Sequence, residues 1–140
     1  MRKGFTLIEL LITMVLVAVL AVIALPKYMN ALERGRVTEA VTVLSEVSEA
    51  WNAQYVINDN TYPEDIEIDI RHLKYFGEPY VEDLSDDQVI VKVDRSDNSY
   101  TLSAVNTEGA LTKIQCEDDT QGADCLSIGM VLKNNEYILE

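Results

Sequence analysis

The stretch Gly4-Phe5-Thr6-Leu7-Ile8-Glu9-Leu10 opens an apolar run that continues to Leu25 and contains a single charged residue. A helix rises about 1.5 Å per residue, so this run would measure roughly 31 Å, which matches the hydrocarbon core of a bilayer. A secretory signal peptide is cut after its apolar core, whereas the small residue here precedes the run. The sequence therefore predicts a retained membrane-spanning helix over residues 5–25, preceded by the short stretch of residues 1–4.

The charged residue in this run, Glu9, is energetically costly there. A carboxylate at the centre of a membrane-spanning helix costs roughly 2.5–3.5 kcal/mol on insertion scales, and less near the membrane edge. A chain that needed only an anchor would do better with Leu at this position. We therefore expect Glu9 to meet a positive partner inside an assembly. The alternative is that Glu9 lies close enough to the interface for its carboxylate to reach water.

With Arg2 and Lys3 ahead of it, the string GFTLIEL resembles the processing site of the type IV pilin family, which includes the pseudopilins of type II secretion. The resemblance covers residues 1 to about 30. It implies that a prepilin peptidase cuts after Gly4 and methylates the new N-terminus at Phe5. It also implies that Glu9 pairs with the Phe5 amine of a neighbouring subunit, a type of ion pair that can set register. Many pilins carry a glycine within the span, and this chain has none between Phe5 and Leu25.

The charges are distributed unevenly along the 140 residues. Residues 1–57 hold five basic and five acidic groups, whereas residues 58–140 hold six basic and 19 acidic groups, so the formal charge of −13 belongs to the C-terminal part. Such a surface repels phosphate backbones, so direct nucleic-acid binding is not expected. Positive charge before a first span tends to stay in the cytoplasm. We therefore expect a single-pass inner-membrane protein whose acidic domain lies outside the cytoplasm.

Helical periodicity continues beyond the apolar run, over residues 26–57. Pro26 removes a backbone hydrogen bond, so a kink is expected there. The turn formers Asn58-Asp59-Asn60 are expected to end the helix. One amphipathic stripe recurs at steps of three and four and should face a sheet; it comprises Val37, Val41, Leu44, Val47, Trp51 and Tyr55.

The segment 58–87 is expected to be a long connection without strong regular structure, of a length that is often functional. Within it, the alternation of Ile66, Ile68 and Ile70 suggests a short extended piece, and 73–76 suggests one turn of helix. The only histidine, His72, has no cysteine or second histidine near it in the sequence and is expected to lie on the surface.

Strand patterns follow over residues 88–140. Alternating apolar residues and intervening turn formers predict three antiparallel strands in sequence, over 88–94, 99–106 and 111–116. The tail over 128–139 has turn residues at 133–135 and could add a strand or a small hairpin.

Cys116 and Cys125 are the only cysteines, and both lie in the part expected to be exported. An oxidising compartment favours a disulfide between them, and two cysteines alone do not supply the four ligands of a structural zinc site. The bridge would close an acidic loop. Calcium is a competing use of the loop carboxylates Asp118, Asp119 and Asp124, although no EF-hand spacing is present.

Together these features predict an α+β fold in which a long, kinked N-terminal helix packs on a small antiparallel sheet. The resemblance implies a structural subunit of a type IV pilus or related filament, extracellular or periplasmic once assembled. Its implied partners are copies of itself, the prepilin peptidase, a cytoplasmic assembly ATPase and a membrane platform protein.

Alternatives within the family are a type II secretion pseudopilin, whose major form usually lacks a C-terminal disulfide and uses calcium there, and a competence pseudopilin. An enzyme and a cofactor are not expected. The sequence shows no serine or cysteine near a histidine, no metal-ligand cluster and no glycine-rich phosphate loop.

Overall fold

The computed structural model describes residues 5–64, 66, 73–120, 122–134 and 136–139. The leader residues Arg2, Lys3 and Gly4, together with Ile68, Ile70 and His72, lie outside the described residues. The elements in chain order are α1 (Leu7–Ile57), β1 (Tyr80–Leu84), β2 (Gln88–Asp94), β3 (Tyr100–Thr107), β4 (Ala110–Asp118), α2 (Ala123–Ser127), β5 (Val131–Lys133) and β6 (Glu136–Ile138).

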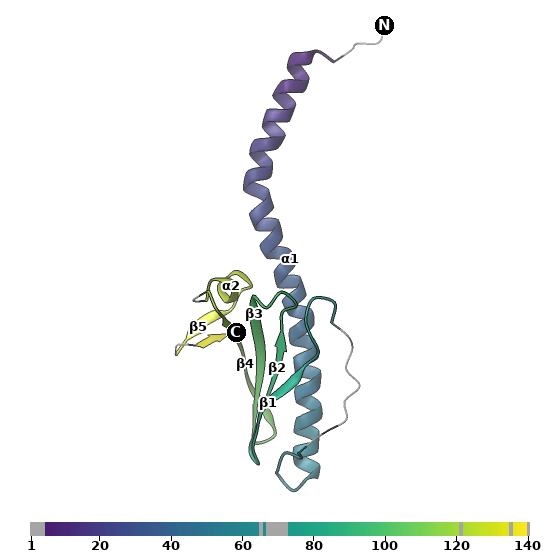
Figure 1. Ribbon diagram of the computed structural model, residues 1–140, viewed down its shortest axis with the longest axis vertical. Helices are drawn as coiled ribbons and strands as arrows, with labels where there is room; N and C mark the ends of the chain where they lie inside the picture. The colour runs from purple at the N-terminus through teal and green to yellow at the C-terminus, as the bar shows by residue number, and fades with distance from the viewer. Residues whose placement is uncertain (1–4, 65, 67–72, 121, 135, 140) are drawn as a thin grey trace.

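Helix α1 dominates the molecule (Figure 1). Its 51 residues correspond to roughly 76 Å, and only its second half packs against the rest of the chain. The helix ends at Asn58, as expected from the turn residues there. Asp59 and Asn60 follow with positive φ angles of 55° and 60°, a backbone conformation that Asn and Asp tolerate better than most residues.

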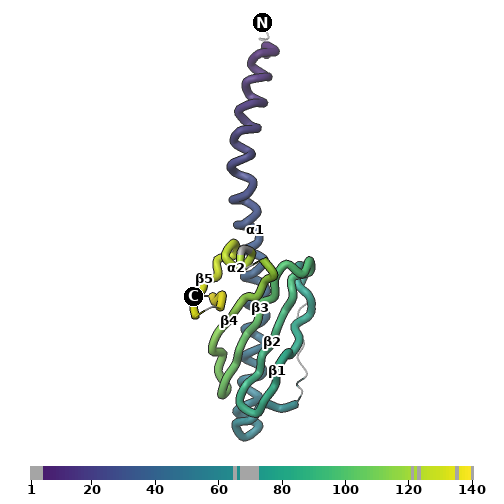
Figure 2. The backbone as a smooth tube through the Cα atoms, turned by 60° about the vertical axis from the view of Figure 1, so that its left-hand side comes forward, coloured from purple at the N-terminus to yellow at the C-terminus, as the bar shows by residue number. Residues whose placement is uncertain are grey.

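The six strands form one antiparallel sheet in the order β1-β2-β3-β4-β6-β5. The predicted meander β2–β3–β4 and the C-terminal hairpin β5–β6 are confirmed. Helix α1 lies along one face of the sheet and crosses β2, β3 and β4 (Figure 2). The result is the predicted α+β arrangement of one long helix on an antiparallel sheet.

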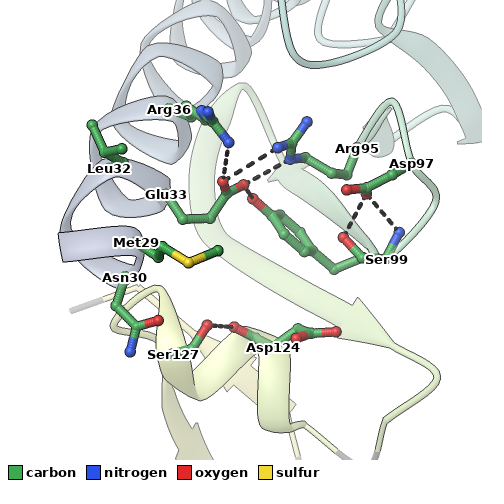
Figure 3. A pocket seen from close by; sticks show the side chains of 11 residues that line it. Met29, Asn30, Leu32, Glu33, Arg36, Arg95, Asp97, Ser99, Asp124 and Ser127 are labelled. Atoms are coloured by element: carbon green, nitrogen blue, oxygen red, sulfur yellow. Dashed lines mark hydrogen bonds and ion pairs between the residues drawn. The ribbon is translucent and has the colours of Figure 1, made fainter. Parts of the chain in front are cut away.

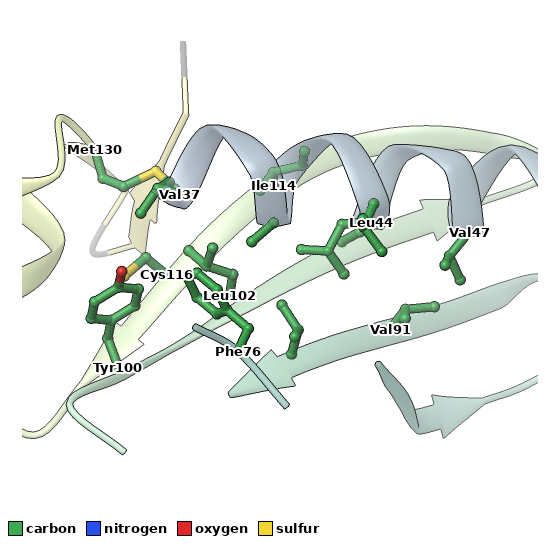
Figure 4. Close-up of a cluster of buried hydrophobic side chains, with 14 of the residues drawn as sticks. Val37, Leu44, Val47, Phe76, Val91, Tyr100, Leu102, Ile114, Cys116 and Met130 are labelled. Atoms are coloured by element: carbon green, nitrogen blue, oxygen red, sulfur yellow. The ribbon is translucent and has the colours of Figure 1, made fainter. Parts of the chain in front are cut away.

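The core lies between the helix stripe and the inner face of the sheet (Figure 4). Leu44 and Leu102 are fully buried, and burying each such side chain contributes about 1.5–3 kcal/mol. Of the predicted stripe, only Val41 is partly exposed. The buried residues of α1 are Val37, Ala40, Val43, Leu44, Val47, Ser48, Trp51 and Tyr55.

Three local features differ from the sequence expectations. The segment expected to be a connection, 58–87, contains the edge strand β1, whose exposed acidic residues mask the strand pattern. Residues 73–76 do not form a helical turn; Phe76 instead makes a β-bridge with Arg95, and its ring is buried. Around Cys125 the chain forms the short helix α2, whose five residues give no clear helical pattern in the sequence.

Candidate assembly site on the N-terminal helix

The first half of α1 exposes an unusual amount of apolar surface. This is the one helix among the described residues that is long and apolar enough to cross a membrane, and its most apolar window has none of its residues buried. Leu7 and Val22, for example, are 80% and 73% exposed. A contiguous apolar surface of this size marks an interaction site. It needs either lipid or other protein around it.

The helix begins at a reciprocal cap formed by Thr6 and Glu9. The Glu9 carboxylate oxygen Oε2 accepts hydrogen bonds from the Thr6 backbone N–H (2.8 Å) and from the Thr6 hydroxyl (2.7 Å). In return, the Glu9 backbone N–H donates to Thr6 Oγ1 over 3.4 Å. Such a capping box satisfies backbone donors that the first turn would otherwise leave free. Glu9 therefore has a structural role within its own chain that the sequence analysis missed, although Thr6 three residues before Glu9 is the signature of this motif.

The other predicted site residues of this segment lie close by. Phe5 is 82% exposed and directly precedes the capped turn, whereas Gly4 lies outside the described residues. Cleavage after Gly4 would place a new amine one helical turn from Glu9 in the same chain. Pro26 lies inside α1, which continues through it without a break, and the kink expected there stays a prediction.

A polar cluster joins α1 to the sheet just below the apolar half (Figure 3). Glu33 Oε1 accepts hydrogen bonds from Arg95 Nε and from the Tyr100 hydroxyl, each at 2.7 Å. Glu33 Oε2 accepts from Arg36 Nη1 (2.8 Å) and Arg95 Nη2 (3.2 Å). Arg95 Nη1 donates to the Tyr75 carbonyl oxygen (2.7 Å). The cluster holds the exposed half of the helix at a fixed place relative to the domain.

The electrostatics of this cluster favour ionised Glu33 and neutral Tyr100. Burial alone would raise the pKa of Glu33, but the hydrogen bonds from Arg95, Tyr100 and Arg36 outweigh burial and lower it. Burial and the Glu33 carboxylate both raise the pKa of Tyr100, so its hydroxyl keeps its proton and donates. Sequence reasoning did not find this cluster because Glu33 and Arg95 are 62 residues apart.

The disulfide between Cys116 and Cys125 is confirmed, with an S–S distance of 2.07 Å. It joins β4 to α2, and the two residues are only 3% and 0% exposed. Inside the loop, Asp118 accepts hydrogen bonds from the backbone N–H groups of Gly122 (2.6 Å), Cys125 (2.9 Å) and Thr120 (3.0 Å). These donors engage Asp118, one of the three carboxylates of the calcium alternative, and they tie the loop to its own backbone.

Acid is expected to loosen this loop before the rest of the domain. Burial alone would raise the pKa of Asp118, but the N–H groups of Cys125, Gly122 and Thr120 outweigh burial and lower it. Because the pKa is lower in the folded state, the carboxylate stabilises the loop above about pH 4, and this contribution is lost as the pH falls through the folded pKa. Amide hydrogen exchange over residues 119–130, measured at about pH 7 and about pH 3 and corrected for intrinsic rates, should show it.

The matched control for this experiment is Asp118→Asn. This variant should exchange faster at neutral pH and lose the selective acid effect, because no carboxylate remains to be protonated. Equal acid loosening in the variant and the parent would contradict the role given to Asp118.

Comparison with known proteins places these features in a family. A family model described as the prokaryotic N-terminal methylation motif matches residues 1–25. The type IV major pilin protein PilE of Neisseria gonorrhoeae is 40% identical over 65 residues, which cover 46% of this chain and 38% of that protein. A fimbrial protein of Neisseria meningitidis is 40% identical over 63 residues, 45% of this chain and 36% of its own length. The chain thus matches well under half the length of these Neisseria relatives.

A longer match decides the assignment. A fimbrial protein of Pseudomonas aeruginosa is 34% identical over 107 residues, which cover 74% of this chain and 67% of that protein. The chain belongs to the type IV pilin family. No solved structure matches this pilin. The match to the methylation motif includes the capped start of α1 and the whole apolar half of the pilin helix.

Proposed function

We propose that this pilin is a structural subunit of a type IV pilus or a related filament. The observation that carries the proposal is the apolar half of α1, which is exposed over its full length while a folded domain covers only the other half. Copies that bundle these halves would bury them in a filament core and leave the acidic domains outside. Burial of apolar surface is the dominant favourable term in such association.

Before assembly, the same half of the helix anchors the subunit in the inner membrane as a single span, with the domain outside the cytoplasm. The prepilin peptidase removes residues 1–4 and methylates the amine of Phe5. The Glu9 carboxylate of one subunit then pairs with the Phe5 amine of a neighbour. Both hydrogen bonds from Thr6 go to Glu9 Oε2, so in this pairing we expect Oε1 to accept from the amine. A cytoplasmic ATPase and a membrane platform protein drive assembly.

The relatives described above are pilins and fimbrial proteins, which favours a pilus subunit over a type II secretion pseudopilin. The Cys116–Cys125 bridge supports the same choice, because the loop has a covalent and a backbone anchor where a major pseudopilin would use calcium.

The processing step can be tested by mass spectrometry of the mature chain. We expect the first residue to be Phe5, with its amine carrying one added methyl group. Electron microscopy of material sheared from cells should then show filaments that contain this chain. An intact Met1, or a cut beyond Leu25, would contradict the processing step, and the absence of filaments would contradict the function.

A further inference from the structure

The end of the domain farthest from the apolar half of α1 is formed by three turns, which we call the distal face: residues 58–64, 85–87 and 107–110 (Figures 1 and 2). Backbone hydrogen bonds join the turns. The Tyr62 N–H donates to the Asp86 carbonyl (3.1 Å), and the Glu108 N–H donates to the Asp87 carbonyl (2.8 Å). The distal face is therefore a connected surface and not three independent loops.

The distal face combines an apolar tip with negative charge. Val56 and Ile57, the last residues of α1, are 70% and 76% exposed beside it. The three turns contain no basic residue, and their acidic residues are all exposed: Asp59, Glu64, Asp86, Asp87 and Glu108. The distal face thus places two exposed aliphatic side chains next to charges of one sign.

The opposite end of the domain has complementary features. Between α1, the β2–β3 turn and α2 there is a cavity of about 410 Å³ (Figure 3). Its lining combines the apolar side chains of Met29 and Leu32 with charged residues of both signs: Glu33, Arg36, Arg95, Asp97 and Asp124. The adjoining helix segment 27–36, which we call the neck, carries three basic residues, Lys27, Arg34 and Arg36. Its one acidic residue, Glu33, is held by Arg95, Tyr100 and the neck's own Arg36, so Lys27 and Arg34 are the remaining positive charges of the neck.

Two basic side chains of the sheet, Lys92 and Lys113, are engaged in ion pairs. Lys92 Nζ lies 2.8 Å from carboxylate oxygens of both Glu82 and Glu117, and Lys113 Nζ lies 2.6 Å from Glu136 Oε2. A chain with a net charge of −13 repels its own copies. In the neck, Lys27 and Arg34 are the positive charges that an acidic surface of a second copy would meet.

We propose that the distal face of one subunit docks on the neck of the next copy, with Val56 and Ile57 entering the cavity beside Met29 and Leu32. The inference rests on the proposed function in one respect: subunits that leave one membrane in one orientation are parallel. A contact between parallel copies must join two different surfaces of the subunit. When such a head-to-tail contact does not close into a ring, it produces an open filament. Apolar contact and opposite charge then act at the same interface.

A cross-linking experiment on full-length chain tests the contact directly. Filaments are sheared from cells that express Leu32→Cys, Ile57→Cys or both, and are treated with a short bifunctional maleimide. We expect a ladder of covalent multimers from the double variant and monomers from each single variant. Filaments of the double variant that yield only monomers would overturn the proposal. Dimers from Ile57→Cys alone would also overturn it, because they would indicate a two-fold contact between identical surfaces.

Charge reversal provides a second test that does not depend on introduced cysteines. Asp86→Lys and Arg34→Glu should each lower filament yield about fivefold or more. An exposed ion pair contributes up to about 1 kcal/mol, and losing that free energy lowers an equilibrium constant by about this factor. Combining them should restore most of the yield. The control is Asp83→Lys, an exposed carboxylate on β1 outside the distal face, which should leave the yield unchanged.

The outcomes separate this inference from the proposed function. If the parent chain makes filaments and Asp86→Lys behaves like Asp83→Lys, the docking proposal is wrong and the pilin function stands. If the parent makes no filaments, the proposed function is wrong and the docking proposal falls with it.

Discussion

Replacing Glu9 with Leu is expected to abolish filaments while the protein stays in the membrane with its domain folded. The substitution removes the only charge in the apolar half of α1. If the proposed pairing holds, it also leaves the amine of a neighbouring Phe5 without its partner. An unpaired buried charge costs several kcal/mol, which is enough to stop assembly at each added subunit. Membrane insertion should improve, since Leu is more favourable than Glu in a span. Electron microscopy and membrane fractionation of the same cells measure both effects.

The capping box makes a sharper version of this experiment possible. Glu9→Gln removes the charge but keeps an amide oxygen that can accept the Thr6 N–H, because Glu and Gln both serve at this position of a capping box. If Glu9 acts only as a cap, Gln should support normal filaments. If it pairs with an amine, Gln should fail almost as badly as Leu.

Thr6→Ala is the matched control for the cap. It removes the hydroxyl bonds at a cost of about 0.5–2 kcal/mol of helix stability and keeps the Glu9 side chain itself. Filaments should persist in this variant. Normal filaments from Glu9→Leu would show that the intermolecular pairing is wrong.

Removing the disulfide is expected to lower the stability of the domain by about 2–5 kcal/mol and to release its C-terminal part first. Both cysteines are buried, so their loss also disturbs packing around Tyr137, which lies opposite Cys116 in the β4–β6 pairing. Denaturant unfolding of the Cys116→Ala, Cys125→Ala double variant, in detergent, measures the change. Hydrogen exchange should locate the early opening in α2 and the β5–β6 hairpin.

The parent chain before and after reduction is a useful comparison with this variant. Thiol alkylation without a reductant should label neither cysteine in the folded parent. Labelling of both cysteines would contradict the disulfide. If the double variant unfolded at the same denaturant midpoint as the parent, the disulfide would not contribute to stability.

The sequence predicted features that depend on periodicity. The stripe from Val37 to Tyr55 repeats at helical spacing, and strands β2 and β3 alternate at a period of two, so local pattern was enough to place them. The disulfide was predictable because only one pair of cysteines exists. Strand β1 was not, because an edge strand exposes most of its residues and its sequence YVEDL does not alternate cleanly.

The polar features were harder to predict, because the type of a polar residue does not determine which group it hydrogen-bonds or pairs with. Asp118 has the chemistry of a calcium ligand, yet its oxygens accept backbone N–H groups. In the sequence, nothing distinguishes Glu33 from other polar residues of the helix. Only the fold brings Arg95 and Tyr100 to its carboxylate. The intermolecular role of Glu9 stays a prediction, since it needs a second subunit.

The two edges of the sheet affect how readily subunits aggregate at high concentration. Exposed strand edges can recruit further strands and grow into amyloid-like aggregates. Here β1 is interrupted by a bulge between Val81 and Asp83 and carries acidic side chains, whereas β5 at the other edge has three residues. Both features disfavour pairing between the strand edges of different copies. We therefore expect concentrated subunits of this chain to resist amyloid-like aggregation.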